Sequence, residues 1–233
     1  MPRVCLMTAP RPSPEAYRRL LVLVAQLGAA TPEQLAAVSR ADPGQIRAMV
    51  ASLVHRRQLR VIETTCTLPA LRPAAGQGRR PEAIFITEEG WKAVQAAALL
   101  RHGRRTARPR SPRSDQVVHH LLVVAAVIDV LRQRQAELVA LAGDEELRSE
   151  SRIGRRLRPG ERDVQLPDAR LTLRTSAGAV DIAEIEILVS KYRSADIVAK
   201  YRALPPATLF FAPTARLCAR VAGLGFPAPR LLR

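Results

Sequence analysis

Residues 31–57 read TPEQLAAVSRADPGQIRAMVASLVHRR, and they contain two closely spaced helix-start patterns. Thr31 provides a hydroxyl N-cap, proline follows at the first helical position, and Gln34 stands three residues on. The residues Asp42-Pro43-Gly44-Gln45 repeat this helix-start pattern. The sequence therefore predicts a short helix over 33–39, a tight turn and a second helix directly after it, which together form a helix-turn-helix.

The second helix has one apolar and one polar face. Residues Ile46, Met49, Val50, Leu53 and Val54 follow the spacing of a buried helical stripe. The opposite face carries polar and basic side chains, which suit contacts with base edges and phosphates. The candidate DNA-binding residues of this segment are Gln45, Arg47, Ser52, His55, Arg56 and Arg57.

A hairpin is expected after this helix. Residues 59–63 and 82–86 alternate like strands, and the loop between them is rich in proline, glycine and arginine. Such a basic-tipped hairpin is typical of a wing, and its candidate DNA-binding residues are Arg72, Arg79 and Arg80. Thr87 then begins a further helix with two acids in its first turn. The alternative is a small helical domain that binds protein and whose arginines are only solvated.

The charge of the chain favours a polyanionic partner. It has 37 Lys and Arg against 21 Asp and Glu, a net charge of +16 and an isoelectric point near 11.4. Double-stranded DNA is the partner expected from this charge and the helix-turn-helix, with binding that weakens steeply in salt. No secretory signal or membrane anchor is evident, and the three cysteines lie far apart. We expect a cytoplasmic bacterial protein that does not bind membranes.

The sequence predicts two domains in an α+β fold. The winged helix-turn-helix is expected over 13–100 and a basic linker over 101–115, in which Arg104 and Arg105 are further candidates for DNA contact. An α/β domain is expected over 116–233. Its predicted elements are a helix over 116–134, strands over 138–141, 169–174 and 179–188, a helix over 190–204, a strand over 207–211 and a helix over 214–224. The order α-β-β-β-α-β is that of a restriction-endonuclease-like core.

Three acids fall near one edge of that predicted core. Asp168 stands at the entry to one strand, and Glu184 and Glu186 share one face of the next because side chains alternate along a strand. Converging carboxylates would suit Mg²⁺ bridging a scissile phosphate, which makes these three residues candidate metal ligands and catalytic residues. The alternatives are ion pairs with Arg170, Arg193 or Lys200, or coincidence.

The segment resembles the PD-(D/E)xK nuclease signature, with Pro167-Asp168 as PD and Glu184-Ile185-Glu186 in place of (D/E)xK. Glu186 occupies the position of the signature's lysine, and Lys191 or Lys200 could reach the site instead. We therefore expect a catalytically degenerate domain, with an active, Mg²⁺-dependent endodeoxyribonuclease or nickase as the alternative.

A winged helix followed by an acidic strand of this kind resembles the replication-relaxation family of plasmid and mobile-element proteins. The resemblance covers residues 31–91, the histidine-led helix after the linker, Pro167-Asp168, the acidic strand and the helix over 191–201. It implies a DNA-binding protein that acts in plasmid replication, copy control, transfer or transcriptional regulation. A homodimer is plausible because a single winged helix reads only a short site. A targeted nuclease and a protein-binding adaptor are the alternatives.

Overall fold

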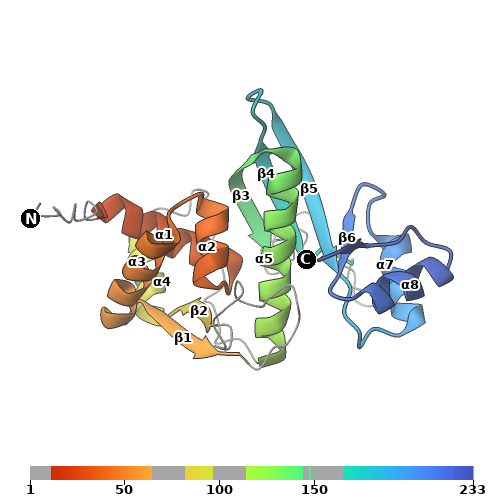
Figure 1. Ribbon diagram of the computed structural model, residues 1–233, viewed down its shortest axis with the longest axis horizontal. Helices are drawn as coiled ribbons and strands as arrows, with labels where there is room; N and C mark the ends of the chain where they lie inside the picture. Colours follow the sequence, from red (N-terminus) through yellow and green to blue (C-terminus); the bar gives the residue numbers. More distant parts are fainter. Residues whose placement is uncertain (1–11, 65–81, 97–113, 144–146, 148–164, 233) are drawn as a thin grey trace, which may run out of the picture.

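The computed structural model describes residues 12–64, 82–96, 114–143, 147 and 165–232 (Figure 1). Helices and strands of the first half gather at one end of the long axis, and helices α7 and α8 lie at the other end, with helix α5 and the larger sheet between them. The elements of the first half are α1 (Pro14–Leu27), α2 (Pro32–Ser39), α3 (Pro43–His55), β1 (Leu59–Glu63), β2 (Glu82–Ile86) and α4 (Glu88–Ala96).

The helix-turn-helix predicted from the sequence is confirmed by α2 and α3. Thr31 Oγ1 accepts a hydrogen bond from the Gln34 backbone N–H at 3.2 Å, and Gln34 Oε1 accepts one from the Thr31 N–H at 3.0 Å. Asp42 Oδ1 likewise accepts from the Gln45 N–H at 2.8 Å. Between the helices, Arg40 adopts the left-handed conformation with φ 54°, which ends α2 and reverses the chain.

The hairpin and the helix after it are also confirmed. Strands β1 and β2 pair in antiparallel fashion from Leu59 opposite Ile86 to Glu63 opposite Glu82. Thr87 Oγ1 caps α4 by accepting a hydrogen bond from the Gly90 N–H at 3.1 Å. The hairpin tip, with Arg72, Arg79 and Arg80, lies outside the described residues, so the wing's contact residues stay predictions.

One position of the predicted buried stripe is wrong. Ile46, Met49, Val50 and Leu53 are buried, but the side chain of Val54 is 37% exposed. Helix α3 ends at His55, one residue after Val54, and the buried stripe stops at Leu53.

The second half contains α5 (Ser114–Arg134), β3 (Glu137–Gly143), β4 (Ala169–Arg174), β5 (Val180–Ile187), α7 (Ser194–Ala203), β6 (Leu209–Ala212), α8 (Ala215–Gly223) and β7 (Arg230–Leu231). The predicted order α-β-β-β-α-β is confirmed, with β7 as an additional short strand. Helix α5 begins at Ser114, inside the predicted linker, and Arg104 and Arg105 lie outside the described residues.

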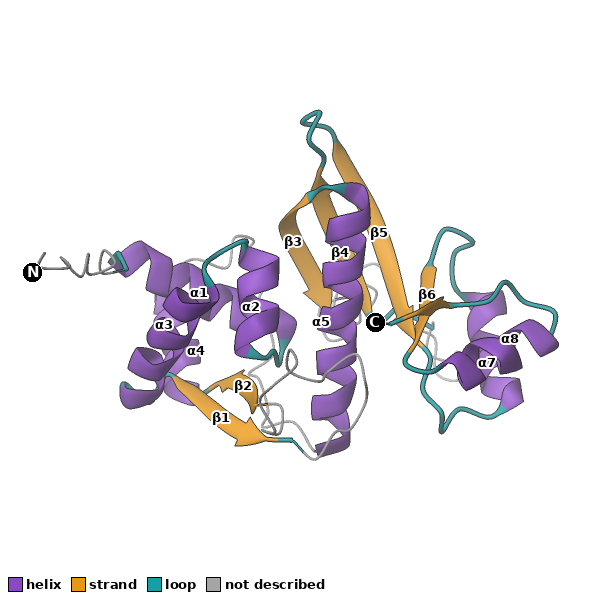
Figure 2. Cartoon of the chain, in the orientation of Figure 1, coloured by secondary structure: helices purple, strands orange, loops and turns teal. Residues whose placement is uncertain are grey.

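These strands form one sheet in the order β3-β4-β5-β6-β7 (Figure 2). The first three strands are antiparallel neighbours, and β5, β6 and β7 run parallel. Ala169, Leu171 and Leu173 of β4 face the core, and so do Ala183, Ile185 and Ile187 of β5. Asp168 and Glu186 therefore fall on the opposite face by strand alternation.

Helix α5 joins the two halves of the molecule. Gln34 Nε2 donates a hydrogen bond to the Leu121 carbonyl at 2.9 Å, and Arg40 Nη2 donates one to the Ala136 carbonyl at 2.8 Å. One continuous cluster of buried residues runs from α1 and α2 through α5 to the sheet. By length and composition alone residues 116–134 of α5 could cross a membrane, with half of that apolar window buried inside the protein. The helix is apolar on both sides because it packs between α2 and the sheet.

Candidate functional site

Helix α3 presents an exposed face that no described element covers. It is α2, not α3, that packs against α5, so the outer side of α3 stays open to solvent (Figure 1). The exposed residues of this face are Gly44, Gln45, Arg47, Ala48, Ala51, Val54 and His55. Two alanines at its centre leave the helix backbone close to the surface, which allows a close approach to a DNA groove. The face therefore combines small side chains at its centre with exposed polar and basic side chains.

The predicted DNA-binding residues of α3 occupy different positions. Gln45, Arg47 and His55 are exposed and belong to the open face, whereas Ser52 is half-buried. Arg47 Nη2 lies 2.7 Å from Glu33 Oε1 of α2, so its guanidinium is held across the helix-turn-helix. This ion pair limits the orientations of Arg47 and places a basic group beside the first turns of α3.

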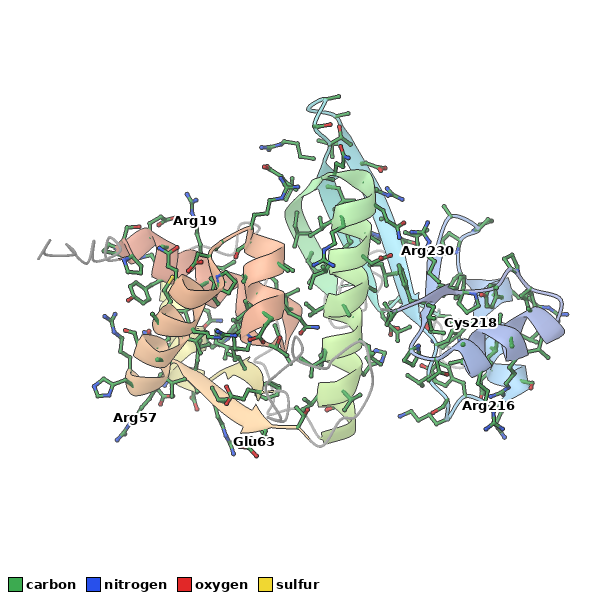
Figure 3. The ribbon with its side chains drawn as sticks, viewed as in Figure 1. Arg19, Arg57, Glu63, Arg216, Cys218 and Arg230 are labelled. Atoms are coloured by element: carbon green, nitrogen blue, oxygen red, sulfur yellow. The ribbon has the colours of Figure 1, made fainter. Side chains whose placement is uncertain are left out.

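Arg56 and Arg57 follow the end of α3. The Arg56 guanidinium lies over the ring of Tyr17 in α1, 5.3 Å from the ring centroid, at cation–π distance. Arg57 adopts φ 58° and is exposed at the outer end of the winged helix (Figure 3). Arg57 is thus exposed to solvent, while the guanidinium of Arg56 contacts Tyr17.

A second group of polar side chains lies where β4 begins and β5 ends. His119 Nε2 of α5 lies 3.1 Å from Asp168 Oδ1, and Asp168 Oδ2 accepts a hydrogen bond from the Ile187 N–H at 2.7 Å. Lys200 Nζ of α7 forms an ion pair with Glu186 Oε1. The Tyr192 ring lies 5.1 Å from Lys200 Nζ. We refer to His119, Asp168, Glu186, Tyr192 and Lys200 as the polar cluster.

Burial governs the protonation of this cluster. Glu186 is fully buried, and neither of its oxygens accepts a regular hydrogen bond from the described residues. Burial and the negative charge of Asp168 raise the pKa of Glu186 to about 7, against the opposing charge of Lys200. Burial lowers the pKa of His119, but its bond to Asp168 outweighs this, so the pKa lies above its ordinary value. The Glu186 carboxyl is therefore expected to change its protonation state near neutral pH.

The third predicted carboxylate does not join the cluster. Glu184 pairs with Arg170 on the adjacent strand, with Nη2 2.8 Å and Nε 3.0 Å from Glu184 Oε1. Lys191 is exposed and precedes α7, whereas Lys200 reaches Glu186. The predicted convergence of Asp168, Glu184 and Glu186 on a metal ion is thus wrong, because Arg170 pairs with Glu184 and Lys200 pairs with Glu186. The ion-pair alternative describes them instead.

The arrangement does not fit the predicted Mg²⁺ site. In the part of the chain that the structure describes, no three His, Cys, Asp or Glu side chains are grouped to hold a metal ion. The ammonium of Lys200 stands against Glu186, and the guanidinium of Arg170 occupies Glu184. Of the three predicted acids, Asp168 is the one whose ion-pair partner among the described residues is a histidine, His119, and not a lysine or arginine. No metal-dependent step follows from this geometry.

The sequence analysis missed His119 and Tyr192 as members of the cluster. His119 is half-way buried on an apolar helix, and its partner lies 49 residues further along the chain. One sequence pattern could have indicated His119. It is a histidine in the second turn of an apolar helix that precedes the Pro167-Asp168 pair. No sequence pattern indicates Tyr192, because an aromatic residue before a helix usually belongs to the hydrophobic core.

No family model matches the chain, and no curated protein matches it. Solved structures of MarR from E. coli are similar to it over 51% of this chain. They include a mutant complexed with operator DNA (16% identity, 71% of that chain, TM-score 0.30), the oxidized form (15%, 71%, 0.28) and the wild-type apo form (17%, 75%, 0.29).

Proposed function

We propose that this protein binds double-stranded DNA and reads its sequence with helix α3. The observation that carries this proposal is the uncovered face of α3, where exposed Gln45 and Arg47 flank the small side chains of Ala48 and Ala51. The wide spacing of large side chains lets the helix enter a major groove, and the Arg47–Glu33 pair holds one basic group in a fixed place. The antiparallel β1–β2 hairpin directly follows, as the wing of such a module does.

The biological role proposed for this activity is in a plasmid or another mobile element of a bacterium. Replication, copy control, transfer and transcriptional regulation all require a protein that marks a DNA site. The support is the resemblance of the winged helix, the Pro167-Asp168 pair and the acidic strand to replication-relaxation proteins. A homodimer acting in the cytoplasm completes the proposal, because two half-sites give the specificity that one module lacks.

The test places a negative charge at the centre of the α3 face. A duplex is first selected from a random pool by the wild-type protein, and binding is then measured by gel shift. Ala48→Glu should weaken binding at least tenfold, because a carboxylate would face the bases and phosphates. The matched control is Ala140→Glu, which introduces the same charge at an exposed alanine of β3. Equal binding by Ala48→Glu and wild type would show that α3 does not contact DNA.

A further inference from the structure

A pocket opens beside the C-terminal end of helix α3. Its volume is about 610 Å³, which lies within the range of sites that hold small organic molecules. Helix α1 forms one wall, α4 forms a second, and the chain between α3 and β1 closes a third side (Figure 1). Its lining includes Tyr17, Arg18, Leu21, Arg56, Ala93 and Val94.

The inner wall of this pocket is apolar and aromatic. Leu21 and Val94 are buried members of the hydrophobic core, and Ala93 packs against that core. The half-buried ring of Tyr17 adds an aromatic surface with a polar hydroxyl. Because burying apolar surface is favourable, such a wall favours a ligand with a ring or a hydrocarbon body.

Two guanidinium groups belong to the same pocket. Arg18 comes from α1, and Arg56 is the C-cap residue of α3. No carboxylate lines the pocket, and no acid among the residues that the structure describes pairs with either arginine. The Arg56 guanidinium contacts the Tyr17 ring instead. Guanidinium groups bind carboxylates, sulfonates and phosphates through paired hydrogen bonds, so this part of the pocket favours an anionic group.

We propose that this pocket binds a small amphipathic anion, which is a molecule with an aromatic or apolar body and one carboxylate, sulfonate or phosphate group. The body packs against Leu21, Val94 and the Tyr17 ring, and Arg18 and Arg56 hold the anionic group. A bare inorganic anion would leave the apolar wall in contact with water. A neutral molecule would leave both guanidinium groups without an anionic partner. The two halves of the lining are matched only by a ligand that has both parts.

The pocket lies at the junction between α3 and the hairpin. The Arg56 N–H donates to the Ser52 carbonyl at 3.1 Å and so closes the end of α3. Gln58 also lines the pocket, and its N–H donates to the Leu53 carbonyl at 2.9 Å while its carbonyl accepts from the Thr87 N–H at 3.1 Å. A ligand that holds the Arg56 guanidinium keeps it from DNA phosphates. On the proposed function, on which this consequence rests, ligand and DNA therefore weaken each other's binding.

A fluorescence titration of the full-length protein with 1-anilinonaphthalene-8-sulfonate tests the pocket without DNA. The emission of this probe rises when its rings enter an apolar site. N-phenyl-1-naphthylamine is the matched neutral probe, because it has the same rings and no sulfonate. The double variant Arg18→Gln, Arg56→Gln should weaken binding of the sulfonate at least tenfold, since two charge-assisted contacts are lost. Its affinity for the neutral probe should change by less than about twofold.

Two further variants locate the probes. Arg19→Gln is the matched control, because Arg19 follows Arg18 in α1 but pairs with Glu15 at 3.1 Å and does not line the pocket. This variant should keep the wild-type affinity for both probes. Ala93→Phe fills part of the apolar wall, so it should weaken binding of both probes.

Three outcomes would overturn the pocket as a site for an amphipathic anion. The first is an unchanged affinity for the sulfonate in the double arginine variant. The second is an equal loss in Arg19→Gln, which would mean that the probe responds to net charge and not to the pocket. The third is displacement of the probe by inorganic sulfate at constant ionic strength, which would assign the site to a simple anion.

The effect on DNA is measured separately, by gel shift with the duplex that the wild-type protein selects. Saturating sulfonate probe should weaken binding of this duplex. Arg18→Gln should raise the probe concentration that is needed, by the same factor as it weakens binding of the probe. An unchanged DNA affinity with the probe bound would overturn the antagonism. If the wild type bound no duplex, the proposed function and the antagonism would both be wrong, while the fluorescence titrations would still decide whether the pocket binds its ligand.

Discussion

The side chain of Gln34 holds the start of α2 to the Leu121 carbonyl of α5. Its Oε1 accepts from the Thr31 N–H at 3.0 Å, and its Nε2 donates to Leu121 at 2.9 Å. Both bonds are buried, so one residue closes the helix cap and fixes the helix-turn-helix on the central helix. The cap was predictable from the sequence because its partners are three residues apart. The bond to Leu121 was not, because it joins residues 87 positions apart.

Replacing this side chain should destabilise the whole protein. Gln34→Ala removes two buried hydrogen bonds, so the free energy of unfolding should fall by about 2 kcal/mol in urea titrations. Gln45→Ala is the matched control, because Gln45 holds the same position in α3 but is exposed. Its effect should stay within about 0.5 kcal/mol. Similar losses in the two variants would contradict the role of the Leu121 bond.

Gly90 should tolerate no larger residue. A Cβ at this position would lie 2.1 Å from the Gln58 carbonyl oxygen and 2.8 Å from Ile86 Cγ1. Gly90→Ala should therefore cost about 2 kcal/mol of unfolding free energy, although alanine favours helices, because the backbone of the β1 entry must shift. Thermal unfolding of both variants tests this expectation. Gly223→Ala in α8 is the control and should be neutral or stabilising, because a Cβ there would meet nothing within 4 Å.

Arg47 should matter for DNA sequence preference and little for stability. Its pair with Glu33 is about half exposed on both sides, and exposed pairs contribute less than about 1 kcal/mol. Arg47→Ala should thus leave urea unfolding nearly unchanged and relax base preference in competition binding. Glu33→Gln keeps the Arg47 guanidinium but removes its ion pair with Glu33, and this variant should retain the affinity for DNA. A large stability loss in Arg47→Ala without any change in preference would point to a structural role.

The polar cluster should make stability depend on pH. The pKa of Glu186 rises from 4.5 to about 7 on folding, so the folded state binds this proton more tightly than the unfolded chain. The free energy of unfolding should therefore fall as the pH rises from about 4.5 to about 7. For one proton the fall is at most about 1.4 kcal/mol per pH unit. The raised pKa of His119 acts in the same direction, because the protonated imidazole is favoured by folding.

Glu186→Gln isolates the contribution of this carboxyl group. Unfolding in urea at several pH values should show a flatter dependence in the variant than in wild type. Glu184→Gln is the control, because Glu184 is held by Arg170 on the same strand pair and has no comparable role in the cluster. An equally steep dependence in Glu186→Gln would assign the proton to another group.

Supercoiled DNA should remain intact when incubated with the protein in Mg²⁺ or Mn²⁺. Lys200 and Arg170 hold the two strand glutamates, which leaves too few free carboxylates to bind a catalytic cation. Agarose gels with and without EDTA test this expectation at low and moderate salt. Metal-dependent nicking that disappears in Asp168→Ala would contradict it and establish a nuclease.

Local patterns predicted the fold well, and long-range pairing limited the prediction of the sites. Helix caps at Thr31 and Asp42 and the alternation of residues 169–174 depend on neighbouring residues, so they are visible in the sequence. The pairing of Glu184 with Arg170 depends on the register of two strands, and that of Lys200 with Glu186 on the return of a helix. These contacts decide whether a carboxylate is free, which sequence spacing alone does not specify.

Helix α5 contributes to both halves of the molecule, and this limits how the chain can be divided. A cut between residues 101 and 115 would separate α2 from the apolar side chains of α5 against which it packs. Each fragment would then expose part of a former interior to water and tend to aggregate. Fusion proteins and truncations intended to isolate the DNA-reading half should therefore carry α5 with it.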